Sequence, residues 1–194
     1  MSTKEKILDV ALTLFSENGY DGTSMEQIAS LVGIKAPSLY KHYKGKEDIL
    51  DTLIDMAEER YDENFGSADR IEKKPDSIEE FMKQAMASVT FTINDPMIRK
   101  MRIFLIKEQF RNRRLAEITT RHQIDGLLSM YTKIVSGMME KGVLRKDDPE
   151  TVAMELIAPV VVYVSKADRQ PECRKDALKA IEKQVRHVCE HYRK

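Results

Sequence analysis

The chain has 194 residues, 42% hydrophobic and 33% charged, an ordinary composition for a folded protein that excludes extended disorder. The formal net charge is zero, so any surface that binds a polyanion must be local. No apolar run is as long as the segment of about eighteen residues that spans a bilayer, and the opening MSTKEK lacks the apolar stretch of a signal peptide. We therefore expect a cytoplasmic protein without a membrane partner, in which Cys173 and Cys189 stay reduced.

The first predicted helix covers residues 3–18. Its apolar residues repeat at helical spacing on one side, and Asn18-Gly19, a pair that tolerates a left-handed cap, ends it. We expect this stripe to close a small domain with the next two helices. The stripe consists of Ile7, Leu8, Ala11, Leu12, Leu14 and Phe15.

Two short helical patterns joined by Gly33 occupy residues 23–46. Thr23 or Ser24, followed three positions later by an acidic or amide residue, is typical of a capping box that opens a helix. Glycine supplies the permissive backbone that a sharp turn requires. The spacing predicts a helix-turn-helix over about residues 24–43. Its apolar positions are Ile28, Ala29, Leu31 and Val32 before the turn, and Leu39, Tyr40 and Tyr43 after it.

The second of these helices is locally cationic. Lys35, Lys41, Lys44 and Lys46 fall in a stretch without an acidic residue, although the first fifty residues together hold six lysines against seven acidic residues. Lysines that displace counterions, with tyrosine and serine hydroxyls that donate to phosphate oxygens, provide affinity for duplex DNA and fix the docking register. The segment therefore predicts a DNA-reading helix.

Roles in DNA binding follow from side-chain chemistry. The phosphate-holding candidates carry hydroxyl or ammonium groups or lie at a helix N-terminus, and the base-reading candidates lie at the start and on the exposed side of the second helix. Tyr43 has an alternative structural role, because its ring can pack against Phe15 and Leu39. We assign Thr23, Ser24, Ser38, Tyr40, Lys41, Tyr43 and Lys46 to phosphates, and Lys35, Ala36, Pro37, Lys41 and His42 to base edges.

In their order, these motifs resemble the DNA-binding domain of TetR/AcrR-type transcriptional repressors. The shared features are an isoleucine-led first helix, the Ile28-Ala29 pair, the Gly33-Ile34 turn, a Leu-Tyr-x-His-aromatic helix and a Lys-Glu-x-x-Leu start to the next helix. The chain departs from the pattern at Ala36-Pro37-Ser38 and at Tyr43. The resemblance covers about the first quarter of the chain. It implies a three-helix DNA-binding domain over residues 1–48, an all-α ligand-sensing and dimerisation domain over residues 49–194, and a homodimer.

Downstream, helical patterns follow one another and strand patterns are nearly absent. We expect a linking helix over residues 46–65, a loop over 66–75, and about nine helices in total. The later helices are predicted over residues 76–93, 97–110, 113–141, 150–167 and from 172 to the end of the chain. The fold class is therefore all-α.

Methionines recur one turn apart on adjacent predicted helices. Flexible thioethers suit a cavity that adapts to varied apolar ligands, but they also fill gaps between helices, and at any single position this second role is the more ordinary one. Together with nearby aromatic residues they predict a site for a small apolar or amphipathic molecule. The candidates are Phe81, Met82, Met86, Met101, Phe104, Met130, Tyr131 and Met138, with Arg99, Arg102, Glu108 or His122 as a polar contact.

The segment 152–164 is apolar on more than one side. Such a helix is either central to its own core or packs both on its own bundle and on a second subunit, and operators with two-fold symmetry favour the dimer. With the last helix it would form a four-helix contact between subunits. The predicted interface comprises Val152, Leu156, Val160, Val161, Val164, Ile181, Val185 and Val188.

Two other classes of function have weaker support. His187 and His191 share a helix face and could bind zinc or nickel, but two ligands do not complete a site. Glu108, Glu117 and His122 could hold carboxylate chemistry, but no catalytic motif accompanies them. We therefore expect no metal, no cofactor and no catalytic residue.

The sequence thus predicts a regulator that binds a palindromic operator as a dimer. A small molecule would swell the C-terminal bundle, tilt the helix over 46–65 and disturb the ~34–36 Å spacing of the two reading helices, releasing the DNA. The alternatives are a nucleoid or division-linked DNA-binding protein without an inducer and, more remotely, a helical-bundle enzyme.

Overall fold

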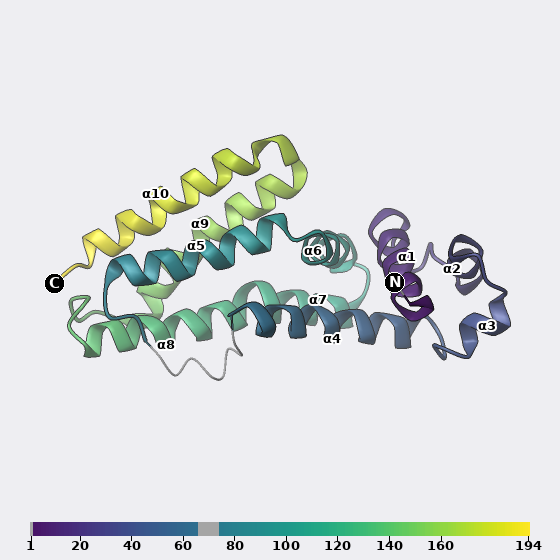
Figure 1. Cartoon of the computed structure of the whole chain (residues 1–194). Helices are drawn as coiled ribbons and strands as arrows, with labels where there is room; N and C mark the ends of the chain where they lie inside the picture. The colour runs from purple at the N-terminus through teal and green to yellow at the C-terminus, as the bar shows by residue number, and fades with distance from the viewer. Residues whose placement is uncertain (1, 66–73) are drawn as a thin grey trace. The chain divides into compact units, whose positions relative to one another are not determined.

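The computed structural model describes residues 2–65 and 74–194, which are helical throughout apart from turns and one isolated bridge between Leu144 and Arg193 (Figure 1). The predicted all-α fold is confirmed. Most of the loop expected over residues 66–75 lies outside the described residues. Within the described part of the chain, no helix is both long and apolar enough to cross a membrane.

The backbone contacts divide the chain into two units. The N-terminal unit comprises residues 1–64 and 96–119, and the C-terminal unit comprises the described residues within 65–95 and 120–194. The helices over residues 96–120 therefore pack with the N-terminal helices, a grouping that the sequence pattern did not indicate. The predicted division after residue 48 concerns function and stays a prediction.

The N-terminal unit contains α1 (Thr3–Asn18), α2 (Met25–Val32), α3 (Ala36–Tyr40), α4 (Lys46–Phe65), α6 (Pro96–Glu108) and α7 (Arg113–Thr120). Ser2 opens α1 through a capping box with Glu5, in which the Glu5 amide donates to Ser2 Oγ at 3.2 Å and the Ser2 amide donates to Glu5 Oε2 at 2.7 Å.

The core of this unit joins α1 to α6. The rings of Phe15 and Phe104, both fully buried, stack with centroids 5.5 Å apart, and the Tyr20 ring also packs against Phe15, with centroids 5.3 Å apart. Leu115 and Ile118 of α7 belong to the same core.

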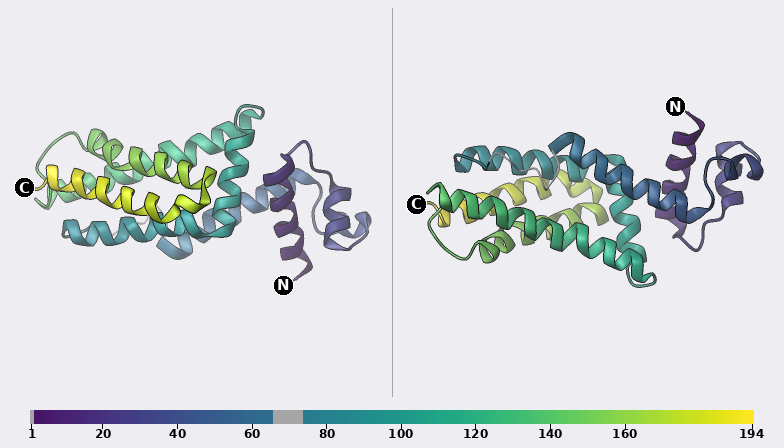
Figure 2. Two further views of the ribbon diagram at one scale, coloured as in Figure 1. Left: turned by 90° about the horizontal axis from the view of Figure 1, so that it is seen from above. Right: turned by 90° about the horizontal axis from the view of Figure 1, so that it is seen from below.

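The C-terminal unit contains α5 (Ile78–Asn94), a π-helical turn η2 (Arg121–Asp125), α8 (Gly126–Glu140), α9 (Pro149–Arg169), a 3-10 turn η3 (Pro171–Cys173) and α10 (Arg174–His191). Helix α9 packs between α8 and α10, and α10 also contacts α5 (Figure 2). Within the single helix predicted over 113–141, η2 is a π-helical turn that inserts an extra residue between α7 and α8.

Candidate nucleic-acid interface

The turn between α2 and α3 is fixed by local hydrogen bonds. Ser24 and Gln27 form the predicted capping box at the start of α2, with N···O distances of 2.7 and 3.1 Å. Gly33 ends α2 in the left-handed conformation at a φ of 82°, and its amide donates to the Ala29 carbonyl at 3.0 Å. From α1, the Lys6 ammonium donates to the Val32 carbonyl at 2.8 Å, which ties this helix end to the domain.

Helix α3 is short and anchored on one side. Lys35 precedes it in an extended conformation and accepts backbone hydrogen bonds from Ser38 and Leu39 at 2.8 and 3.3 Å, and Pro37 occupies its first turn. Leu39 is fully buried in the core of the N-terminal unit. Burial of this side fixes which side chains face outward.

Most of the predicted DNA-binding residues of this segment lie at the surface. Lys35, Pro37, Tyr40, Lys41 and His42 are exposed, and Tyr40 leaves 49% of its surface open to solvent. Ser24, Ala36 and Ser38 are half-buried. Exposed ammonium, phenol and imidazole groups on one short helix and its following turn are suited to reach a duplex.

Two of the predicted contacts already have hydrogen-bond partners, and a third residue is buried. Thr23 is buried and donates from Oγ1 to the Gly19 carbonyl at 2.9 Å. The Lys46 ammonium donates to the Tyr20 carbonyl at 2.7 Å and lies 4.6 Å from the centre of the Tyr20 ring. Tyr43 is buried, and its hydroxyl has no hydrogen-bond partner among the described residues. The roles of these three residues in DNA binding stay predictions.

Tyr43 combines a buried ring with a nearby cation. The Lys4 ammonium of α1 lies 5.6 Å from its ring centre. Burial, and next the neighbouring carboxylate of Asp48, raises the pKa of the Tyr43 hydroxyl, so it stays protonated at neutral pH. The core-packing alternative for Tyr43 accounts for this position of the ring.

Helices α6 and α7 contact α1 and α4 through polar side chains that the sequence did not reveal. Lys100 Nζ donates to Thr13 Oγ1 at 2.8 Å, and Lys107 Nζ donates to the Ser16 carbonyl at 2.6 Å. Arg114 of α7 binds both Glu47 and Asp51 of α4. A sequence gives no direct sign of such pairs, because their members lie more than sixty positions apart.

The eight predicted ligand residues are divided between two cores. Met101 and Phe104 belong to the core of the N-terminal unit, whereas Phe81, Met82, Tyr131 and Met138 are buried in that of the C-terminal unit, with Met86 and Met130 packed against it. Phe81 and Tyr131 meet edge to face at 6.1 Å. These contacts agree with the alternative in which the methionines fill gaps between helices. The assignment of these residues to a ligand site stays a prediction.

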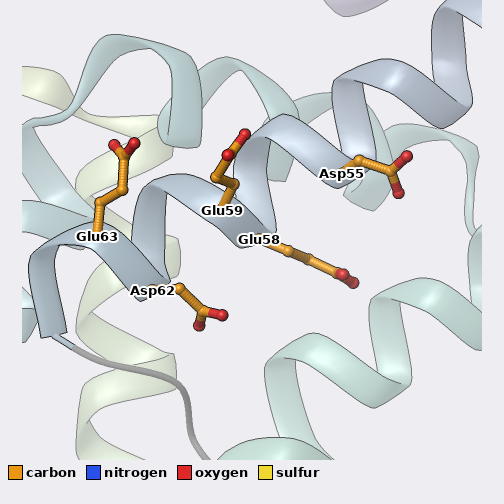
Figure 3. A pocket seen from close by; sticks show the side chains of 5 residues that line it. All are labelled: Asp55, Glu58, Glu59, Asp62 and Glu63. Atoms are coloured by element: carbon orange, nitrogen blue, oxygen red, sulfur yellow. The ribbon is translucent and has the colours of Figure 1, made fainter.

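A shallow hollow of about 560 Å³, open to solvent, lies along the exposed side of α4 and is lined by Asp55, Glu58, Glu59, Asp62 and Glu63. Figure 3 shows these five carboxyl groups projecting from the helix, with Glu59 and Glu63 to one side and Glu58 and Asp62 to the other. None of the predicted ligand residues lines this hollow.

The predicted dimer residues are mostly internal. Five of the eight are buried in the core of the C-terminal unit, and the other three are partly buried. The outward side of α9 carries Met154, Ala158 and Val162, of which Val162 is 62% exposed. The buried five are Val152, Leu156, Val164, Ile181 and Val185, and the partly buried three are Val160, Val161 and Val188.

Two of the residues weighed for metal binding or catalysis, His191 and Glu117, have other partners. His191 Nε2 lies 3.0 Å from a guanidinium nitrogen of Arg145, and Glu117 pairs with Arg113 at 3.0 Å. Over residues 2–65 and 74–194, no group of three or more His, Cys, Asp or Glu side chains could hold a metal ion.

Comparison with known proteins agrees with the resemblance noted from the sequence. Residues 7–53 match the family described as bacterial regulatory proteins, tetR family. The biofilm operon icaADBC negative transcriptional regulator IcaR of Staphylococcus epidermidis is 44% identical over 70 residues, which cover 32% of this chain and 38% of IcaR. IcaR of Staphylococcus aureus (strain Newman) is 54% identical over 51 residues, 26% and 27% of the two chains. The alignments thus span well under half of these relatives.

Solved structures share the fold over nearly the whole chain. SmeT in complex with triclosan has a TM-score of 0.80 at 21% identity, and the alignment covers 100% of this chain and 93% of SmeT. The fatty acid metabolism regulator described for Clostridium perfringens has a TM-score of 0.70 at 18% identity, covering 95% of this chain and 97% of its own. At these identities the likeness concerns the fold.

Proposed function

We propose that this chain, which carries the DNA-binding domain of the tetR family of bacterial regulatory proteins, is a transcriptional repressor that binds duplex DNA through α2 and α3. The observation that carries the proposal is the exposed cationic surface of residues 35–44 on a turn fixed by Gly33 and Leu39. Relatives that share the N-terminal quarter are named as negative transcriptional regulators, which favours repression over activation.

In this proposal α3 enters the major groove. Lys35 and Pro37 at its start, with Lys41 and His42 just after it, approach base edges, while Tyr40 and Ser38 donate to phosphates. The half-buried Ser24 lies at the N-terminus of α2, where the helix dipole favours a phosphate. Lys46 reaches a phosphate only by leaving the Tyr20 carbonyl, and this makes it a secondary contact.

The repressor acts as a homodimer on a palindromic operator. The outward side of α9 supports this assignment, because Met154, Ala158 and Val162 form an apolar stripe at four-residue spacing that a second copy would cover. We therefore place the centre of the dimer interface on these residues, with Val160, Val161 and Val188 at its edges and the five buried residues supporting it from within.

A small apolar or amphipathic molecule is the proposed effector. The support is that SmeT, whose fold this chain shares, has been solved with triclosan. An effector that releases the DNA must favour the non-binding conformation, typically by about 1–3 kcal/mol. One observation favours the alternative of a DNA-binding protein without an effector: Phe81, Met82 and Met138 are already packed in a core.

Selection of DNA from a pool of random duplexes tests the proposal. The purified protein is expected to enrich an inverted repeat whose half-sites lie about one helical turn, ~34–36 Å, apart, since each subunit reads one half-site. A His42→Ala variant is expected to change the preferred bases, because its side chain is exposed beside α3. A selection that enriches no sequence with either protein would exclude an operator-binding repressor.

A further inference from the structure

The start of α4 presents a charge problem for any DNA-binding surface on α3. After the lysine-bearing stretch 35–46, Glu47, Asp48 and Asp51 follow within five positions, and residues 47–51 hold no basic residue. Carboxylates beside a phosphate backbone repel it and oppose the attraction of the neighbouring lysines. Asp48 is engaged locally, because it accepts a hydrogen bond from the Lys44 amide at 2.9 Å. Glu47 and Asp51 need another partner.

Arg114 of α7 is that partner. Its Nη1 lies 3.0 Å from Glu47 Oε1, and its Nη2 donates to Asp51 Oδ1. Glu47 and Asp51 lie one turn apart on α4, so a single planar guanidinium spans both. The hydrogen bond with Asp51 raises the pKa of Arg114, which remains charged throughout.

The arginine projects from a rigid support. Leu115 is fully buried and Ile118 nearly so in the core of the N-terminal unit, and the Leu115 amide donates to Asn112 Oδ1 at 3.2 Å where α7 begins. Helix α7 therefore holds Arg114 in place, and the guanidinium does not have to be ordered by its acidic partners alone.

A second contact holds the same turn of α4. It comes from Tyr20, which precedes α4 in the sequence, whereas Arg114 follows it. The Tyr20 carbonyl accepts a hydrogen bond from the Lys46 ammonium, which also lies over the face of the Tyr20 ring. Burial chiefly raises the pKa of Tyr20, Glu47 raises it further, and Arg114 lowers it, which places these groups within one electrostatic neighbourhood. The two contacts together attach the Lys46 and Glu47 side chains to the rest of the unit.

We propose that Arg114 is a positioning residue for DNA binding, which neutralises Glu47 and Asp51 and holds the first turn of α4 beside the lysine-bearing surface. This role rests on the proposed function and extends it to a residue outside the helix-turn-helix. Loss of the guanidinium leaves two uncompensated carboxylates next to the DNA and removes one of the two contacts.

Arg113 provides a matched control. It carries the same charge one position away, its side chain is 93% exposed, and it pairs with Glu117 of its own helix. A loss of overall positive charge would weaken DNA binding equally in Arg113→Ala and Arg114→Ala, whereas the proposed role affects only Arg114. Ion pairs at such exposed positions contribute little to folding, so both variants are expected to fold.

The experiment measures binding of the selected duplex by fluorescence anisotropy for the wild type and both variants. Arg114→Ala is expected to weaken affinity roughly tenfold and Arg113→Ala less than twofold. In a Glu47→Gln, Asp51→Asn background, Arg114→Ala is expected to have no further effect, as a double-mutant cycle requires if the residues act together. Equal effects of the two arginine variants, or a loss that persists in that background, would overturn the proposal.

Hydrogen exchange separates failure of this inference from failure of the proposed function, because it needs no DNA. The amides of Leu50 and Asp51 in α4 are expected to exchange faster in Arg114→Ala than in the wild type and in Arg113→Ala. If the wild type binds no duplex, the proposed function fails, and the role of Arg114 in DNA binding fails with it. Hydrogen exchange then shows only whether Arg114 holds the first turn of α4. If the wild type binds DNA and exchange is the same in all three proteins, Arg114 does not hold this turn.

Discussion

Gly33 is the residue on which the helix-turn-helix geometry most directly depends. Its φ of 82° lies in the left-handed region, and a Cβ built there would meet no atom within 4 Å. The requirement for glycine is therefore set by the backbone conformation alone, without any packing restriction.

Gly33→Ala is expected to destabilise the N-terminal unit by about 1 kcal/mol, the cost of a left-handed non-glycine residue. Gly45→Ala is the control, since Gly45 also has open space at its Cβ and does not have a positive φ. The unfolding free energy of Gly45→Ala should be unchanged or up to about 1 kcal/mol higher than that of the wild type, because alanine restricts the conformations of the unfolded chain. Urea denaturation measures both variants, and an equal loss in the two would contradict the backbone explanation.

At this scale the sequence predicts residues whose role is local. Ser24 and Gly33 act through atoms three or four positions away, so their motifs are visible in the chain. Lys46 could not be placed, because its partner Tyr20 is distant in the sequence and is met only when α4 returns beside the end of α1. The outward position of Leu31, which is 61% exposed, was also not evident from its helical spacing.

Among the helices, α4 carries a notable repulsion. Asp55, Glu59 and Glu63 follow one another at four-residue spacing, which places three like charges on neighbouring turns (Figure 3). Such pairs destabilise a helix by a few tenths of a kcal/mol each.

Glu59→Lys is expected to raise the midpoint of thermal unfolding by about 2–5 °C, because it replaces two repulsive pairs by two attractive ones. The difference from the wild type should shrink in 1 M salt, where the Debye length falls to about 3 Å. A gain that persists unchanged at high salt would show that charge is not its cause.

The helices themselves were largely predictable, since apolar periodicity and capping residues depend on neighbours only a few positions apart in the sequence. The π turn η2 was not, because the apolar pattern is helical on both sides of it. In η2 the Gly126 amide bonds the Arg121 carbonyl, and a Cβ at Gly126 would come within 2.8 Å of that carbonyl oxygen. The periodicity of Met82, Met86 and Met138 indicated burial but not whether a ligand or another helix covers them.

For the whole molecule, two buried ionisable groups link stability to pH. Burial raises the pKa of the Cys189 thiol from 9.0 to about 12 and that of the Tyr131 hydroxyl from 10.0 to about 12. Both pKa values are higher in the folded state than in the unfolded chain. The stability that these neutral groups contribute is therefore complete below about pH 9 and is lost as the pH rises towards 12.

Cys189→Ala is expected to flatten this decline. Between pH 9 and 12 the unfolding free energy of the wild type should fall more steeply than that of the variant, by up to about 1.4 kcal/mol per pH unit, the slope of one proton. Cys173→Ala removes the chain's other thiol and serves as the matched control. Urea denaturation at each pH gives the profiles, and identical profiles for the two alanine variants would contradict the assignment to Cys189.

The proposed dimer makes a second prediction at this scale. Val162→Glu introduces a charge into the centre of the outward side of α9 and should weaken dimerisation at least about tenfold, since an unpaired carboxylate would be buried. Thr90→Glu adds the same charge at an exposed position on α5 and should leave the association unchanged. Sedimentation equilibrium measures both, and a Val162→Glu protein that remains dimeric would place the interface elsewhere.

The central claim is that the exposed surface of α3 binds duplex DNA. The most direct test is to measure the affinity of the wild type and of Tyr40→Ala for the DNA upstream of its own coding region at several salt concentrations. We predict that wild-type affinity falls steeply with salt and that Tyr40→Ala weakens it about tenfold without unfolding the protein. Binding that is insensitive to salt, or equal in both proteins, would contradict the claim.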